Sequence, residues 1–185
     1  MISGFLKKLL FARQFSIIDG KIEVLGEKQI MLSAVALMEL QNIDKSKVYD
    51  IVKDAAKKEM KNVEHAKVYS ALKQVSLVDI KKFGSKLGSG IGGVLKNIED
   101  IFEMYGLGKL KVADLNNEKK KANLIIGNSS IAKAYAEKYG RGGNVCVITA
   151  AVLAGMFSYL FGKDVNCIEV SCGAGSGSSC KFVVK

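Results

Sequence analysis

Several residue types are absent from this chain or nearly so. Proline and tryptophan do not occur, histidine occurs once, and two of the 185 residues are arginine. Without proline or a low-complexity tract, apart from one glycine–serine loop, nothing indicates an interdomain linker, so we expect one domain over residues 1–185. The single histidine, His65, lies in a lysine-rich region with a helical pattern, and no G-K-[ST] phosphate loop occurs. The sequence therefore predicts no catalytic residues.

The shortage of arginine limits what the positive charge can mean. The net charge is +10, yet Arg13 and Arg141 are the only arginines among 28 basic residues. Proteins that read nucleic-acid sequence depend on arginine for bidentate contacts to bases and phosphates. Lysines such as Lys53 and Lys57 are scattered along predicted helices, which indicates a solvated lysine surface and no specific nucleic-acid partner. Non-specific binding to polyanions stays open as the alternative.

Long hydrophobic runs are scarce as well. Residues 145–162 carry no charge, and their length is at the lower limit of what can span a bilayer. Small residues such as Ala150 and Gly155 favour instead a fully buried helix in close contact with its neighbours. A secretory peptide is not predicted, because Lys7 and Lys8 interrupt the first apolar stretch. We expect a cytoplasmic protein with no transmembrane segment.

Hydrophobic periodicity and turn signals predict an α+β fold, in which an antiparallel sheet packs against several helices. The Asp19-Gly20 pair predicts a hairpin over residues 15–25, with a second turn at residues 26–27. Residues 1–12 predict an amphipathic arm helix that packs on its own domain, a dimer mate, a membrane or another protein. Further helices are predicted over residues 29–41, 45–63, 65–75, 77–105, 129–139 and 145–162, and further strands over 108–115, 122–127, 165–170 and 181–184.

A glycine-rich motif, G-x-G-x-x-G, occupies residues 88–93. It binds dinucleotides when it follows a strand and opens a helix, but the residues before it have a helical pattern. Gly84, Gly88 and Gly92 recur every four residues and would share one helix face. We interpret that face as a close helix contact, with a flat ligand or a dinucleotide as the alternatives.

The cysteines are confined to the C-terminal part of the chain, between Cys146 and Cys180. Together with Glu169 and Cys172 these two residues supply three thiolates and one carboxylate, which suit a tetrahedral zinc shell. The glycine-rich link between Cys172 and Cys180 can turn tightly around an ion. The sequence thus predicts a C-terminal hairpin pinned by zinc. Two disulfides and four inert core thiols are the alternatives.

The stretch from Cys146 through Glu169-Val-Ser-Cys172 to Cys180-Lys-Phe-Val resembles the vinyl-4-reductase-type small-molecule-binding domain family, in kind its stand-alone archaeal members. The Asp19-Gly20 hairpin and the glycine-bearing helix are also similar to that family. The resemblance implies a fold similar to transport-particle (TRAPP) subunits, a homodimer, and zinc held by three cysteines and a glutamate. Those ligands correspond to Cys146, Glu169, Cys172 and Cys180.

Cys167 is left over by this correspondence. It lies two residues before Glu169, so both side chains would face the same way on a regular strand, and Cys167 is an alternative ligand. Cys172 has the opposite parity. We therefore expect the strand to break near Val170 or Ser171.

These observations predict a non-enzymatic sensor or carrier, stabilised by zinc, that binds a small hydrophobic or aromatic molecule. With no attached ATPase or DNA-binding segment, we do not expect a transcription activator. A reductase acting on a vinyl or tetrapyrrole substrate, a hydrolase with an open zinc site, and a scaffold or adaptor protein are the alternatives. Helical position suggests six residues for the ligand pocket: Tyr69, Phe83, Leu87, Phe102, Met104 and Tyr105.

Overall fold

The structure, a computed structural model, describes residues 15–24, 27–74, 91–175 and 179–185. Within these residues it contains five helices and seven strands, and every strand pair is antiparallel. The predicted α+β class is confirmed. Three predicted features lie outside the described residues: the arm helix over residues 1–12, the pocket candidates Phe83 and Leu87, and most of the glycine motif, including Gly84 and Gly88.

A small sheet at the N-terminal side has the order β1-β2-β3, and its strands span Phe15–Ile18, Lys21–Val24 and Glu27–Gln29. The predicted hairpin is confirmed, because Asp19 and Gly20 have φ values of 51° and 73°, as a tight two-residue turn requires. The predicted turn at Glu27 and the helix start at Gln29 are wrong. Gln29 pairs with Ile22 across the sheet, so cross-strand hydrogen bonds prevail over the helical pattern there.

Five helices follow in the described residues: α2 (Ala34–Ile43), α3 (Lys45–Gln74), α5 (Ile91–Met104), α6 (Ser130–Tyr139) and α7 (Val147–Phe161). Three of them begin at a polar side chain that accepts a hydrogen bond from the first turn. These caps are Ser33 for α2, Asp44 for α3 and Ser129 for α6. The segments expected over residues 45–63 and 65–75 form the one helix α3.

The larger sheet has the order β4-β5-β7-β6, with strands at Lys109–Asn116, Lys121–Gly127, Ser179–Val184 and Cys167–Ser171. Alternate side chains on its inner face are buried, among them Leu124, Phe182 and Val184. β6 lies at one edge of this sheet. It therefore pairs with β7 alone and presents its other edge to the helices.

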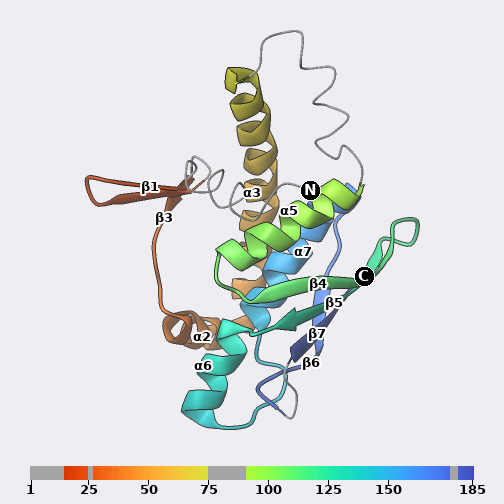
Figure 1. Cartoon of the computed structure of the whole chain (residues 1–185). Coiled ribbons are helices and arrows are strands. Elements are labelled where there is room, and N and C mark those ends of the chain that lie inside the picture. Colours follow the sequence, from red (N-terminus) through yellow and green to blue (C-terminus); the bar gives the residue numbers. More distant parts are fainter. Residues whose placement is uncertain (1–14, 25–26, 75–90, 176–178) are drawn as a thin grey trace.

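Helix α7 is the centre of the molecule and packs against both α3 and the larger sheet (Figure 1). The prediction of a buried apolar helix is confirmed, and no described helix is long and apolar enough to cross a membrane. Gly155 lies where α7 meets α3. A Cβ atom there would be 2.3 Å from the Lys53 carbonyl oxygen, so the close approach requires glycine.

Candidate metal centre

The C-terminal half of the chain brings three thiols and one carboxylate together in space. Cys146 is the N-cap of α7, Glu169 lies on β6, Cys172 follows β6, and Cys180 lies on β7. Their ligand atoms all lie within 4.8 Å of one another, and the three cysteines are buried. The structure thus assembles the four residues that the sequence singled out.

The spacing of the sulfur atoms suits a tetrahedral ion. The Sγ atom of Cys146 lies 3.8 Å from that of Cys172 and 3.9 Å from that of Cys180, and the last two are 3.9 Å apart. A tetrahedral zinc with Zn–S bonds of about 2.3 Å places its sulfurs about 3.8 Å apart. A disulfide needs about 2 Å, and all four cysteines of the chain are free.

A break in β6 lets Glu169 and Cys172 reach the same point. Glu169 pairs with Phe182 on β7, but Ser171 pairs with Lys181, so the register shifts across Val170. One extra residue in a strand reverses the alternation of the side chains that follow it. The predicted strand break near Val170 or Ser171 is confirmed.

The carboxylate of Glu169 has one oxygen engaged and one oxygen unpaired. Its Oε2 atom accepts a hydrogen bond of 2.9 Å from the Cys146 amide. Its Oε1 atom is buried without a hydrogen-bond partner in the part of the chain that the structure describes. Burial raises the pKa of Glu169 to about 7. A buried oxygen without a partner is costly, and a cation among the three sulfurs would satisfy it.

The three clustered thiols influence one another. Hydrogen bonding with Cys172 and Cys180 raises the pKa of Cys146 far above its usual value. The pKa of Cys180 is lowered to about 4, because Cys146 and Cys172 donate to its sulfur and so does the Gly173 amide, at 3.2 Å. Thiolate is the form that binds metals, so this arrangement of donors favours a metal site.

Cys167, the alternative ligand, is not among the four clustered residues. It is buried on β6, where its backbone amide donates to the Tyr49 hydroxyl at 2.8 Å and its carbonyl accepts from the same hydroxyl at 3.1 Å. Burial raises the pKa of the Cys167 thiol far above its usual value. The structure favours Glu169 over Cys167 as the fourth ligand.

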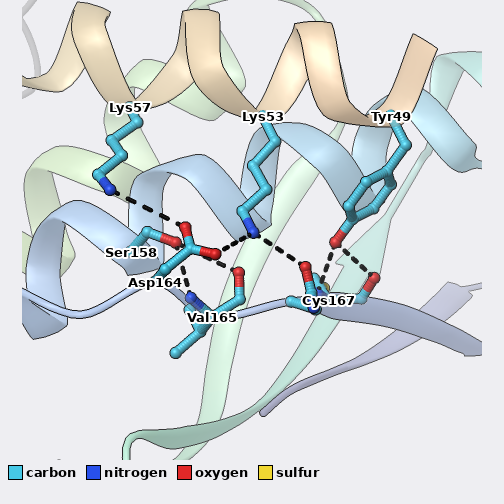
Figure 2. A network of polar contacts seen from close by, with 8 residues as sticks. Tyr49, Lys53, Lys57, Ser158, Asp164, Val165 and Cys167 are labelled. Atoms are coloured by element: carbon cyan, nitrogen blue, oxygen red, sulfur yellow. Dashed lines mark hydrogen bonds and ion pairs between the residues drawn. The ribbon is translucent and has the colours of Figure 1, made fainter. Parts of the chain in front are cut away.

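A polar network fastens the start of β6 to α3 (Figure 2). The Lys53 ammonium donates to Asp164 at 2.8 Å and to Asn166 at 2.9 Å. Lys53 is only 8% exposed, so the prediction that it belongs to a solvated lysine surface is wrong. Its charge is tolerated there because Asp164 neutralises it. Together with Tyr49, one turn earlier on α3, this lysine holds β6 in place close to Glu169.

A cleft of about 560 Å³ opens between α3, α7 and β6, beside the four clustered residues. Tyr49, Cys146, Val147, Cys167 and Glu169 are among its lining residues.

The predicted pocket residues do not identify this cleft. Neither Phe102 nor Tyr105 is among its lining residues. Phe102 is fully buried in the core, and Tyr105 is half-buried beside it. Tyr69 and Met104 lie on α3 and α5. The predicted pocket stays a prediction.

Three residues around the centre were not predicted: Gln41, Tyr49 and Asn144. The Asn144 side chain donates to the Glu169 carbonyl at 2.7 Å, and its place two residues before Cys146 is the only signal that pointed to it. Gln41 and Tyr49 come from α2 and α3 and contact residues more than 100 positions away. No local pattern identifies such partners.

Comparisons with known proteins agree with this geometry. The model of the vinyl-4-reductase-type domain matches residues 131–185, which include all four clustered residues. One similar solved structure is the phenol-responsive sensory domain of the transcription activator PoxR with phenol. Its TM-score is 0.62 at 18% identity, over 100% of this chain and 91% of that one.

Another is trafficking protein particle complex subunit 3 from Naegleria fowleri, covalently bound to palmitic acid, with a TM-score of 0.41 at 12% identity over 82% and 93% of the two chains. No curated protein matches the chain in sequence. The PoxR likeness shows a shared fold, and the family match includes the whole candidate centre. Through residues 131–185, this chain belongs to the vinyl-4-reductase-type domain family.

Proposed function

We propose that this protein binds a small hydrophobic or aromatic molecule without transforming it, and that zinc bound by Cys146, Glu169, Cys172 and Cys180 stabilises the fold around it. The observation that carries the zinc proposal is the cluster itself, with three sulfurs 3.8–3.9 Å apart and an unpaired, buried Glu169 Oε1. Four protein ligands close a tetrahedral shell and leave no position for a reacting water, as in structural zinc sites. When bound, zinc would link β6 and β7 to the start of α7.

The small-molecule proposal rests on fold and family. A domain of the same fold is phenol-responsive, and its structure was solved with phenol. The cleft beside the candidate centre has a volume of about 560 Å³, within the usual range for small-molecule sites. Burial of an apolar ligand would supply about 25 cal/mol per Å² of contact.

Native mass spectrometry of protein purified without added metal tests both parts. We expect one zinc ion per chain, with or without a co-purifying apolar molecule. Protein without bound metal would overturn the zinc centre and leave the cysteines as core thiols.

A titration of the zinc-loaded protein with phenol, substituted phenols and a fluorescent fatty acid tests the ligand class. We expect at least one of them to bind with a heat signal and to raise the melting temperature. If all of them failed to bind, the sensor or carrier function would be contradicted, whatever the metal content.

We also propose that the protein is a cytoplasmic homodimer. Free thiols suit a reducing compartment. Large apolar side chains are exposed next to and along α2, among them Ile30 at 85%, Met31 at 76% and Ile43 at 79%. Exposed apolar patches of this kind mark contact surfaces, and a second copy is the partner that the proposal assigns.

A further inference from the structure

Helix α7 differs from α2, α3 and α6, because its N-cap residue does not cap it. Ser33, Asp44 and Ser129 each accept a hydrogen bond from an amide in the first turn of α2, α3 and α6. The N-cap of α7 is Cys146, and its side chain makes no such bond. Its thiol contacts those of Cys172 and Cys180 instead.

The missing cap comes from a distant part of the chain. The Oε1 atom of Gln41, on α2, accepts a hydrogen bond of 3.2 Å from the Ile148 amide in the first turn of α7. The Nε2 atom of the same side chain donates to the Val145 carbonyl. The two ends of one carboxamide therefore hold the backbone on both sides of Cys146.

Gln41 is fully buried, with 0% of its surface exposed. A buried amide is costly unless it is hydrogen-bonded, and here both of its polar atoms bond to the segment that carries Cys146. A further backbone contact of this segment is made by the Cys146 amide, which donates to Glu169. The backbone around Cys146 is thus held by one residue of the cluster and by one residue that lies outside it.

We propose that Gln41 is a positioning residue of the metal centre: it caps α7 from α2, and so leaves the Cys146 thiol free to bind the ion. This inference rests on the proposed zinc function. Outer residues that orient metal ligands typically change metal affinity by about 10- to 100-fold when they are replaced. We expect a loss of that size when Gln41 no longer bonds to Val145 and Ile148.

The test compares Gln41→Met with Ser158→Ala in the full chain. Methionine fills a similar volume but makes neither hydrogen bond. Ser158 is the matched control, because its buried hydroxyl bonds to the Val165 amide and carbonyl near the opposite end of α7. Zinc affinity is measured by competition with a chromophoric chelator. Absorption by the cobalt-substituted protein reports the sulfur–metal geometry, which a purely structural role would leave unchanged.

We expect Gln41→Met to bind zinc about 10- to 100-fold more weakly and to change the sulfur-to-cobalt bands, while Ser158→Ala matches the wild type in both. Equal affinities and spectra for the two variants would overturn the inference and leave the zinc centre intact. If the wild type bound no zinc, the proposed function would fail, and the inference with it. Should Gln41→Met not fold, Gln41→Glu decides, because it keeps the acceptor for Ile148 and loses the donor to Val145. A wild-type affinity in that variant would also count against the inference.

Discussion

At the scale of single residues, position decides what a cysteine does in this protein. Cys146, Cys172 and Cys180 approach one another to within 3.8–3.9 Å, whereas Cys167 stands apart and its backbone bonds to Tyr49. All four are buried, so burial alone does not distinguish a ligand from a core thiol. The distinguishing observation is the convergence of sulfurs and a carboxylate on one point.

Replacement of single cysteines should separate these two roles. We expect Cys172→Ser to lower zinc affinity by at least about tenfold, because a thiolate ligand is lost. Cys167→Ala should keep one zinc per chain and the wild-type affinity. Metal analysis after dialysis against a chelator provides the measurement. Equal metal loss in both variants would contradict the proposed ligand set.

The carboxylate of Asp164 gives a prediction for pH. The hydrogen bond from Lys53 lowers the pKa of Asp164 below its usual value. An acid with a lowered folded-state pKa stabilises the fold above its unfolded pKa, and this contribution is lost as the pH falls through the folded value. Asp164→Asn should therefore be less stable than the wild type at neutral pH, by less than about 1 kcal/mol because the side chain is mostly exposed.

Urea unfolding of both proteins from pH 7 down to pH 3 checks this expectation. The difference between the two free energies of unfolding should close below about pH 4, near the usual pKa of aspartate. A difference that does not change with pH would mean that the ion pair with Lys53 contributes nothing to stability.

At the scale of helices and strands, the contact of α3 with α7 holds the site together. Tyr49 and Lys53 lie one turn apart on α3, and both reach residues at the start of β6. Gly155 allows the two helices to approach closely enough for these contacts. The metal centre at one end of α7 therefore depends on packing along the helix.

A methyl group at Gly155 tests the importance of this contact. Alanine normally stabilises a helix by about 1 kcal/mol relative to glycine, but here its Cβ would meet the backbone of α3 at 2.3 Å. We expect Gly155→Ala to reduce the free energy of unfolding by about 1–3 kcal/mol, as overpacked cores do. Gly127→Ala is the control, because no atom lies within 4 Å of a Cβ added there, and its effect should stay within about 0.5 kcal/mol. Chemical denaturation measures both. A Gly155→Ala protein as stable as the wild type would show that the helices separate without cost.

At the scale of the whole molecule, the exposed apolar side chains are gathered on one part of the chain. Residues 30–32 and several positions on α2 carry them, while the small sheet β1-β2-β3 extends to one side of the body (Figure 1). An exposed surface of this kind favours self-association. The proposed homodimer is thus argued from surface chemistry.

One added charge should disturb such a dimer. We expect Met31→Asp to shift the protein from dimer to monomer, because a carboxylate would be buried unpaired in an apolar contact. Asn123→Asp adds the same charge at an exposed position on β5 and should leave the dimer intact. Light scattering coupled to size-exclusion chromatography gives the masses. A monomeric wild type would contradict the proposed dimer.

Much of the fold follows from short-range signals. The Asp19-Gly20 turn, the Ser129 cap and the apolar run before Gly162 each depend on residues only a few positions apart, and the structure contains all of them. The prediction failed at Gln29, where pairing across the sheet outweighed a helical pattern. It failed also at Lys53, where a partner 111 residues away neutralises a buried charge.

The sequence by itself determined the ligand types, the parity argument for a break in β6 and the buried character of α7, because these depend on residue chemistry and local periodicity. Only the tertiary structure decided that Gln41 caps α7, that Tyr49 holds β6, and that Cys167 stands apart from the cluster. The physical reason is the range of the interactions. A helix or a turn is encoded by its neighbours, whereas a buried polar side chain takes whichever partner the packing of distant elements places beside it.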